Sequence, residues 1–416
     1  MYVNIMKNIL YMAPQNVIPP VDGGKIGIYY PLLFLSKFYD LYLFFIKDVS
    51  ENVDINDYLA LGIKGVEYCE LDKKDRLINL LLNYSKKEPF KFQKYFNCLC
   101  LNKIDEIVLK NKIDLIICSH PHLFKYALYL KKKYNIKILL REHNLEYQLV
   151  YEYYKYAKNP VKKYIAYTQY IKTKKYETKA WNIADGVVFI SDTDYKEAVK
   201  YSKNIEHFYL VYDGFIINKF KTNDIIKNRE YEPFSCIFTG NLNTLQNRIN
   251  LNWFIKSIWL NFIKKNYKYK LYITGNNDQS ITEKLSYKIS ELNKINIFNL
   301  GFVKDIDAAI SSKQFFISPS IIGSGIRIKI LHALSLGVPV FATIKDYEMI
   351  SLFDDMNNII MFKDFEEFEI KINNLTINME NYNNIAINGF NLIKNNLSWL
   401  SYSYKMRDIL KKNNLT

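Results

Sequence analysis

The sequence lacks a long uncharged apolar run. Its most apolar early stretch, Ile26 to Ile46, is interrupted by Lys37 and Asp40. A helix that spans a bilayer needs about 20 mainly apolar residues, so we expect none in this chain. The opening sequence, MYVNIMKNILYMAPQ, also lacks the basic region, apolar run and small-residue cleavage site of a secretory leader, so we predict no signal peptide.

Cysteine and histidine are scarce as well. The five cysteines lie at positions 69, 98, 100, 118 and 236, without a C-x-x-C pair or a plausible disulfide ladder. This usage favours a reducing cytoplasm and argues against disulfides and structural zinc. His120 and His122 follow an apolar strand, but no third or fourth ligand is evident, so we expect no metal site.

Acidic residues are the minority among the charged ones. The chain has 57 basic and 42 acidic residues and a net charge of +15, which favours nucleic acid, anionic membranes or phosphorylated ligands as partners. Lys, Ile, Asn and Tyr are all abundant, as AT-rich coding would produce, so part of this charge is compositional. No nucleic-acid-binding module is recognisable and the charges are spread along the chain, so we predict no nucleic acid partner.

The length and the strand pattern predict two α/β domains. A chain of 416 residues with 49% apolar residues can build two cores, and apolar strands alternate with helices throughout. A polar connector over 214–233 separates the halves. We place the first domain at 1–215, the second at 216–385 and a helical tail at 386–416. Open parallel sheets bind ligands at the carboxyl ends of their strands, where we look for a site.

The stretch from Phe315 to Thr343 holds the most informative pattern. It reads as a strand, a glycine loop, a helix from about 326 to 336 and a second strand. Arg327 and Lys329 stand at the helix N-terminus, which prefers acidic side chains by roughly 0.3–1 kcal/mol. Two cations beside glycines and free N–H groups predict a phosphate site. The alternative is an ordinary strand–helix–strand unit with exposed basic residues.

The same stretch carries a family resemblance. GSGIRIKILHALSLGVPVFAT resembles the donor-binding segment of the group-1 retaining glycosyltransferases, family 4, and more narrowly their G-S-G-x-R-x-K subgroup. FTGNLNTLQNRINLNWF, from Phe238 to Phe254, is similar to a second family motif. Two family glutamates eight positions apart are replaced here by Ser324 and His332. The resemblance implies the GT-B fold: two Rossmann-like domains with parallel sheets facing each other across a cleft, and a C-terminal helix returning to the N-terminal domain.

The resemblance also implies a nucleotide diphosphate sugar as the donor. Arg327 and Lys329 would hold its diphosphate, and more so because Asn241 stands where many relatives have an arginine. His332 would face the ribose and accept a hydrogen bond in place of the family glutamate. The residues implied around the donor are Gly23, Gly24, Gly240, Asn241, Asn247, Gly275, Val303, Gly323, Ser324, Gly325, Ile326, Ile328 and His332.

A charged loop, REHNLEY, follows the predicted strand that ends at Leu140. Charged clusters at the carboxyl end of a strand are often functional. The family has a similar H-N-x-E segment, whose histidine is associated with the transferred sugar. We therefore expect His143 to act in catalysis together with Arg327 and Lys329, and Lys25, Asn144 and Glu146 to bind the acceptor.

The implied reaction is sugar transfer with retention at the anomeric carbon, to a saccharide or lipid-linked saccharide in cell-surface polysaccharide or glycolipid synthesis. Fixed cations and a helix N-terminus can stabilise the leaving diphosphate. Because the D-x-D motif of metal-using transferases is missing, we expect no metal and no cofactor. The alternatives are a sugar-nucleotide epimerase of the same fold and a nucleotide-sugar or polyanion-binding protein without catalysis.

A tyrosine-rich and lysine-rich segment, Val150 to Lys179, predicts a membrane-facing helix. Basic and aromatic side chains on one helix suit an anionic lipid surface, where each lysine adds about 1 kcal/mol. We expect a cytoplasmic protein that lies peripherally on the inner face of the plasma membrane. The alternative is a solvated lysine-rich helix. The lysines are Lys155, Lys158, Lys162, Lys163, Lys172, Lys174 and Lys175.

Overall fold

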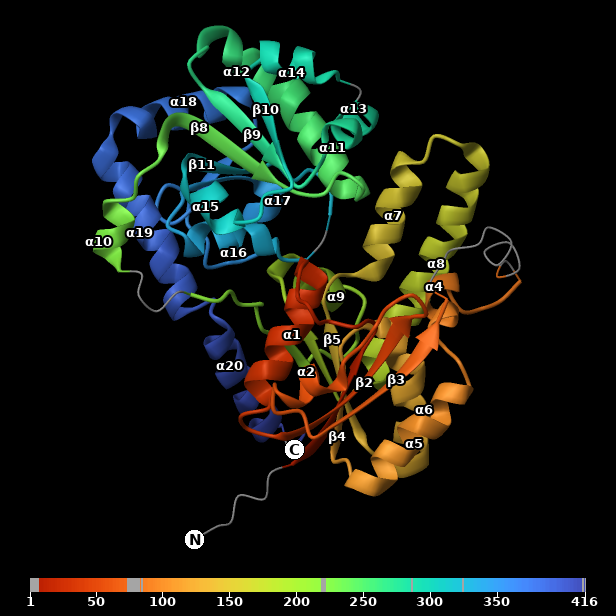
Figure 1. Ribbon diagram of the computed structural model, residues 1–416. Helices are drawn as coiled ribbons and strands as arrows, with labels where there is room; N and C mark the ends of the chain where they lie inside the picture. Colours follow the sequence, from red (N-terminus) through yellow and green to blue (C-terminus); the bar gives the residue numbers. More distant parts are fainter. Residues whose placement is uncertain are drawn as a thin grey trace. The chain divides into compact units, whose positions relative to one another are not determined.

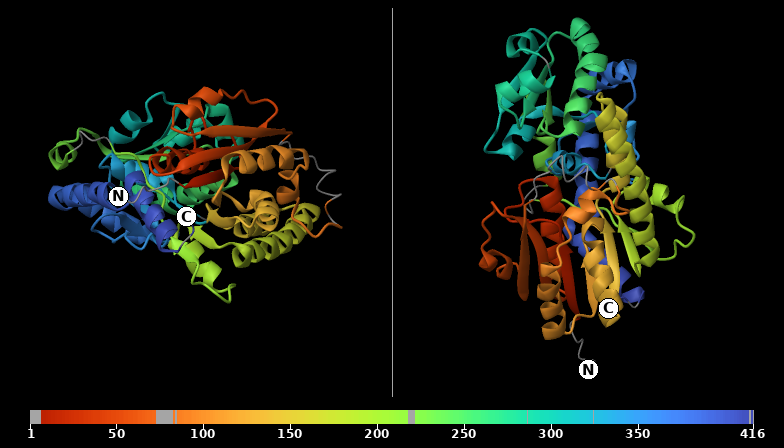
Figure 2. Two further views of the ribbon diagram at one scale, coloured as in Figure 1. Left: turned by 90° about the horizontal axis from the view of Figure 1, so that it is seen from below. Right: turned by 90° about the vertical axis from the view of Figure 1, so that its right-hand side faces the viewer.

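The chain forms two compact units. The computed structural model describes residues 7–72, 83, 85–217, 222–285, 287–323, 325–413 and 415. Unit 1 comprises Met1–Asp213 and Trp399–Thr416, and unit 2 comprises Gly214–Ser398 (Figure 1). Each unit contains one parallel sheet with helices packed on its faces (Figure 2), which is the doubly wound α/β architecture that the strand pattern predicts.

The sheet of unit 1 has seven strands in the order β3-β2-β1-β4-β5-β6-β7, all paired in parallel. Side chains alternate between its faces: Leu10 and Met12 enter one core cluster, and Ile9 and Tyr11 enter the other. Both faces are therefore buried, which explains the nearly continuous apolar strand sequences. The strands are β1 (Asn8–Ala13), β2 (Asp40–Asp48), β3 (Gly65–Leu71), β4 (Leu115–Cys118), β5 (Lys137–Glu142), β6 (Gly186–Phe189) and β7 (Phe208–Leu210).

The helices of unit 1 cover this sheet. On one face, α1 packs against α20, whose Trp399, Tyr402 and Met406 complete the core. On the other, α5 and α6 cover the strands. The helices are α1 (Gly23–Leu35), α2 (Ile55–Leu59), α4 (Phe90–Lys94), α5 (Leu99–Asn111), the 3-10 turn Pro121–Leu123, α6 (Phe124–Tyr134), α7 (Glu146–Tyr156), α8 (Pro160–Ile183), α9 (Asp192–Val199) and α20 (Trp399–Lys412).

The sheet of unit 2 has six parallel strands in the order β10-β9-β8-β11-β12-β13. In both sheets the strand order reverses beside the first strand, β1 or β8. Such a switch point leaves a crevice beyond the carboxyl ends of the adjacent strands, where open α/β sheets bind ligands. The strands are β8 (Glu232–Thr239), β9 (Lys270–Thr274), β10 (Ile297–Gly301), β11 (Lys313–Ser318), β12 (Val340–Thr343) and β13 (Ile360–Phe362).

The helices of unit 2 enclose an aromatic core that includes Phe254, Trp259 and Phe368. A π-helical turn, Ile255–Trp259, joins two of them into one continuous element. The helices are α10 (Asn223–Lys227), α11 (Leu245–Phe254), α12 (Leu260–Lys265), α13 (Asp278–Leu285), α14 (Ile289–Lys294), α15 (Ile306–Ser311), α16 (Ile328–Ser335), α17 (Ile344–Tyr347), α18 (Phe365–Ile377) and α19 (Met379–Asn395). Within the described residues, no helix is long and apolar enough to cross a membrane.

The units divide at Ser398 and Trp399, whereas the sequence placed the start of the tail at 386. Position 386 falls inside α19, which packs against α16 of unit 2: a side chain on Gly389 would overlap Leu334. Helix α19 continues to Asn395, and the chain re-enters unit 1 only with α20. The apolar face of α19 therefore belongs to unit 2.

The segment predicted as one lysine-rich helix is a hairpin of two, α7 and α8. The break comes from Pro160, which occupies the first turn of α8, and from Asn159, whose side chain accepts a hydrogen bond from the amide of Lys162 at 3.1 Å. A residue before proline avoids helical backbone angles. These two residues end one helix and start the next.

The expectation of unpaired cysteines is wrong for one pair. Cys69 of β3 and Cys100 of α5 form a disulfide, with their Cα atoms 6.0 Å apart. The two residues are 31 positions apart in sequence, and only the packing of α5 beside β3 brings them together. Spacing alone gave no sign of this pair.

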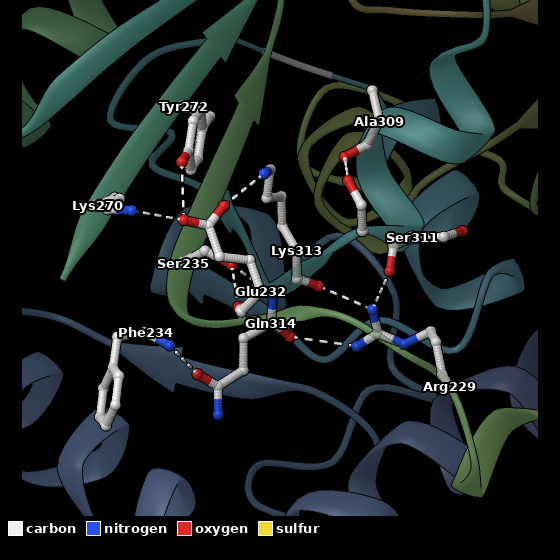
Figure 3. Close-up of polar contacts among 11 residues, drawn as sticks. Arg229, Glu232, Phe234, Ser235, Lys270, Tyr272, Ala309, Ser311, Lys313 and Gln314 are labelled. Carbon is white, nitrogen blue, oxygen red and sulfur yellow. Dashed lines mark hydrogen bonds and ion pairs between the residues drawn. The ribbon is translucent and has the colours of Figure 1, made fainter.

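A charged cluster ties together the amino ends of three strands of unit 2 (Figure 3). Glu232 of β8 accepts hydrogen bonds from Lys270 at 2.8 Å, Tyr272 at 2.9 Å and Lys313 at 2.7 Å. Partial burial opposes ionisation, but these three donors outweigh it and lower the pKa of Glu232 to about 2. The cluster lies at the opposite end of the sheet from the carboxyl ends.

We predict that Glu232→Gln lowers the free energy of unfolding by about 1–2 kcal/mol at pH 7, after allowance for partial exposure. A carboxyl with a depressed pKa stabilises the fold only while it is ionised. The wild-type protein should therefore lose this stability as pH falls from 4.5 towards about 2. Urea unfolding across this range measures both effects. Glu230→Gln, at an exposed position two residues earlier, is the control and should change little. An identical pH dependence in wild type and Glu232→Gln would contradict the prediction.

Candidate functional site

In unit 2, the loops after β8 and β9 pack backbone to backbone. A side chain on Gly240 would come within 2.9 Å of Asn247, and one on Gly275, where φ is +98°, within 3.3 Å of Gly240. Asn276 closes the contact: its Nδ2 donates to the carbonyl of Gly240 at 2.7 Å, and its Oδ1 accepts from the amide of Leu242 at 2.7 Å. The sequence-predicted Gly240, Asn247 and Gly275 therefore lie together.

The glycine loop after β11 is held by a residue that the sequence analysis missed. Buried Asn250 of α11 accepts from the amides of Ile321 at 2.9 Å and Ile322 at 3.1 Å, and donates to the carbonyl of Ile322 at 3.2 Å. Gly323 and Gly325 have φ of +115° and +72°, so the loop needs glycine at both positions. Ser324 lies outside the described residues. Helix α16 begins at Ile328, two residues later than predicted.

Arg327 lies against this loop. Its Nη2 donates to the carbonyl of Ile322 at 2.9 Å, and its Nε lies 3.3 Å from both Ser320 Oγ and Asp346 Oδ1. The Asp346 side chain is fully buried and also accepts from Ser318 Oγ at 2.5 Å. Arg327 of the predicted phosphate segment is therefore ion-paired with a buried carboxylate that lies just beyond the end of the segment and was not expected.

Lys329 extends from α16 to the end of β8. Its Nζ donates to the carbonyl of Thr239 at 3.3 Å and lies 4.3 Å from the centre of the Phe238 ring. Burial lowers the pKa of Lys329 to about 8; nearby Asp346 opposes the shift and Arg327 adds to it. Lys329 is thus a half-buried cation at the end of β8, at the switch point of the sheet.

The other residues predicted to lie around the donor are found in several places in unit 2. His332 Nε2 lies 2.6 Å from Asp307 Oδ1, and its ring stacks on Phe215 at 4.7 Å. Contact between His332 and a ribose stays a prediction. Three half-buried residues, Val303, Ile326 and Ile328, flank the strand ends, and Asn241 is exposed.

In unit 1, Gly23, Gly24 and Lys25 form the first turn of α1. Asp22 caps this helix by accepting from the amide of Lys25 at 2.9 Å. A side chain on Gly24 would meet nothing closer than 3.4 Å. The glycine pair is therefore an exposed helix start with no conformational need for glycine at position 24.

His143 lies in a buried polar cluster at the carboxyl ends of β4 and β5. Its Nε2 accepts from Nη1 of Arg141 and lies 3.0 Å from Ser119 Oγ. Because a guanidinium can only donate, the imidazole nitrogen that faces it acts as the acceptor. Burial, reinforced by Arg141 and by His120 stacked at 4.1 Å, holds the pKa of His143 well below its usual range. His143 is therefore a neutral hydrogen-bonding group at neutral pH.

Arg141 organises this cluster. Its side chain is fully buried, pairs with Asp213 and donates to the carbonyl of Gly27 at 2.8 Å. A side chain on Gly27 would come within 3.2 Å of both Asp213 and His143, so these two groups would have to shift by a few tenths of an ångström to make room for it. Arg141 belongs to the loop REHNLEY that the sequence analysis singled out, but no sequence pattern pointed to Gly27 or Asp213.

Glu146 begins α7 and is buried. Its carboxylate lies 2.9 Å from Lys91 Nζ and 3.4 Å from His122 Nε2. These two neighbours outweigh the effect of burial and hold the pKa of Glu146 well below its usual range. Asn144 is half-buried beside it. Acceptor contact by Asn144 and Glu146 stays a prediction. In the part of the chain that the structure describes, no three His, Cys, Asp or Glu side chains are grouped to hold a metal.

Comparison with known proteins finds a family whose model matches the segment that contains this site. Residues 233–378, which include the phosphate segment and both cations, match the model of the group 1 glycosyl transferases. Over 407 residues the chain is 26% identical to an uncharacterised 44.6 kDa protein in the cps region of Klebsiella pneumoniae, covering 94% of this chain and 96% of the relative. Unit 2 thus carries the sequence pattern of the group 1 glycosyltransferases.

Solved structures show that the fold is that of GT-B glycosyltransferases. HepE of Anabaena in complex with UDP aligns with a TM-score of 0.68 at 13% identity, over 98% of this chain and all of that one. TarM of S. aureus, in complex with fondaparinux, alpha-GlcNAc-glycerol and UDP, aligns with a TM-score of 0.64 at 12% identity, over 97% of this chain and 99% of that one. At these identities the likeness is one of fold.

We predict that Gly323→Ala destabilises unit 2 more than Gly301→Ala does. Both glycines have positive φ, which costs an alanine roughly 1–2 kcal/mol. A methyl group on Gly323 would also overlap the guanidinium of Arg327, whereas one on Gly301 meets nothing closer than 3.9 Å. Chemical unfolding of the two variants measures the difference. Equal losses would show that Arg327 does not need the space above Gly323.

Proposed function

We propose that this protein is a retaining glycosyltransferase that moves a sugar from a nucleotide diphosphate sugar to a saccharide or lipid-linked saccharide. The main support is the position of Lys329: a partly desolvated cation at the switch point of unit 2, inside the segment that matches the group 1 glycosyl transferases. Fixed cations in poorly solvated places stabilise the negative charge that develops on a leaving diphosphate.

UDP is the first nucleotide to test. HepE, whose fold this chain shares, has been crystallised with UDP and with UDP-glucose, and TarM with UDP. The relative in the cps region of Klebsiella pneumoniae supports a role in cell-surface polysaccharide synthesis. Neither comparison specifies the sugar or the acceptor for this chain.

The proposed chemistry uses groups of the chain itself. Lys329 would neutralise charge on the leaving diphosphate, and Arg327 would support the glycine loop around it. His143 is proposed to contact the transferred sugar, where its neutral imidazole can exchange hydrogen bonds with hydroxyl groups. We propose no metal and no protein nucleophile. The chain would differ from its relatives at Ser324 and His332, which replace the two family glutamates.

We predict that a nucleotide diphosphate sugar raises the melting temperature and is turned over in the presence of EDTA. A ligand that binds only the native state stabilises it in proportion to RT ln(1 + [L]/Kd). The measurement is a thermal-shift panel of UDP, GDP, ADP and CDP sugars, followed by detection of the released nucleoside diphosphate with saccharide acceptors.

The outcomes of this panel separate the candidate functions. Turnover that EDTA abolishes and manganese restores would overturn metal independence. Binding without release of a nucleoside diphosphate would favour a binding protein, and conversion of the donor to an epimer would favour an epimerase. Arg327→Ala/Lys329→Ala, folded by circular dichroism, is the control that should lose the thermal shift.

A peripheral position on an anionic membrane is also proposed, because the α7–α8 hairpin exposes aromatic and basic side chains together. Tyr153, Val161 and Tyr164 are 52%, 63% and 55% exposed. Lysines lie among them on both helices and on the connecting turn. Aromatic rings with lysines at a water-facing tip match the headgroup region of an anionic bilayer. The exposed lysines of the tip are Lys155, Lys158, Lys162 and Lys163.

We predict that replacing these four tip lysines by glutamine reduces binding to vesicles that contain phosphatidylglycerol. Each lysine near such a surface contributes about 1 kcal/mol, so binding should fall by more than tenfold. Co-sedimentation measures it. A matched control replaces four exposed lysines of unit 2, Lys256, Lys264, Lys294 and Lys304, and changes the net charge equally. Equal losses in both variants, or wild-type binding that does not depend on anionic lipid, would contradict the proposal.

A further inference from the structure

A buried carboxylate pairs with Arg327 of the phosphate segment and acts electrostatically on Lys329. Asp346 is in α17, directly after β12, and its side chain is fully buried. It accepts hydrogen bonds from Ser318 Oγ of β11 at 2.5 Å and from Arg327 Nε at 3.3 Å. A carboxylate at this place would repel a diphosphate. We therefore expect it to have a second role that favours binding.

The contacts of Arg327 suggest that role. The guanidinium bonds to the carbonyl of Ile322, to the hydroxyl of Ser320 and to Asp346, and it occupies the space that a side chain on Gly323 would fill. These partners belong to the glycine loop and to α17. Arg327 therefore links the loop to the end of β12, with Asp346 as the fixed point.

Lys329 is placed differently. Its ammonium group has three donors, and it bonds to the carbonyl of Thr239 at a long 3.3 Å. Two charged groups act on it, Asp346 from α17 and Arg327 from the start of α16, while β8 contributes the Thr239 carbonyl and the Phe238 ring. A weakly bonded ammonium group at the end of β8 can turn to a phosphate oxygen without breaking the loop.

We propose that Asp346 is a positioning residue of the phosphate site. By holding Arg327 against the glycine loop, it makes the arginine a structural brace and leaves Lys329 as the cation that contacts the diphosphate. This inference rests on the proposed function, because it assumes that a nucleoside diphosphate binds here. It adds to that function a separate role for each cation: Arg327 supports the glycine loop, and Lys329 contacts the diphosphate.

The variant Asp346→Asn distinguishes two possible roles of this carboxylate, which have opposite effects on ligand binding. If the carboxylate only repels the ligand, its removal should tighten nucleoside diphosphate binding. If it positions Arg327, its removal leaves the guanidinium without its buried partner and loosens the loop, so binding should weaken. Asp346 also favours the charged form of Lys329, so the variant should lose affinity at lower pH than the wild type.

The first experiment is calorimetric titration with UDP between pH 6.5 and 9.5. Lys329→Ala should weaken binding by about 10- to 100-fold and reduce its pH dependence around pH 8. Asp346→Asn should bind more weakly than wild type throughout, with the loss starting at lower pH. Binding by Asp346→Asn that is equal to or tighter than that of the wild type overturns the inference.

The second experiment needs no nucleotide. The rate at which Lys329 is acylated, followed by mass spectrometry across pH, reports its charge state. The midpoint should lie near pH 8 in the wild type and lower in Asp346→Asn. An unchanged midpoint in Asp346→Asn overturns the inference even if UDP does not bind. If the wild type binds none of UDP, GDP, ADP and CDP, this result contradicts the proposed function itself.

Two further variants provide a control and an alternative to Asp346→Asn. Asp355→Asn removes a carboxylate of unit 2 that pairs with Lys371 at 2.6 Å, and it should leave UDP affinity and the Lys329 midpoint unchanged. Ser318→Ala removes a hydrogen bond from Asp346 but keeps its charge. It should weaken UDP binding in the same direction and by less, which provides the measurement if Asp346→Asn does not fold. Unchanged UDP affinity in Ser318→Ala overturns the inference in that case.

Discussion

The constraint that governs this molecule is the burial of each parallel sheet on both faces. Helices cover both sides of the strands, so apolar side chains occupy the faces and charged groups gather where the strands end. At the amino ends of unit 2 they form the Glu232 cluster, which joins three strands. At the carboxyl ends, beside each switch point, they form the polar clusters around His143 and Lys329.

Each of these carboxyl-end clusters contains an arginine paired with a buried aspartate. In unit 1 the pair is Arg141 and Asp213; in unit 2 it is Arg327 and Asp346. Removing one member of a buried pair leaves the other charged and unsatisfied, so each pair fixes the loops that contribute its members.

Motif and pattern predicted the architecture well, because they depend on local regularities. Alternating strands and helices indicated two parallel sheets, and the glycines at 323 and 325 have the positive φ that a tight loop requires. Predictions that depended on packing were less successful. The disulfide between Cys69 and Cys100 and the unit boundary after Ser398 follow from contacts between elements. The hairpin break at Asn159 has a local cause, the helix cap before Pro160, which the sequence analysis overlooked.

The sequence by itself determined the class of fold, the glycine loop and the two cations at the start of α16. Those features lie within short stretches, where residue type and spacing set the backbone and the charge. Only the tertiary structure decided that Arg327 is ion-paired with Asp346 and that Lys329 bonds to the end of β8. Asp346, Asn250 and Asp213 come from other elements and reach their partners through the packing of the sheet and helices. Side-chain partnerships across elements depend on the register of strands and helices, which no local pattern specifies.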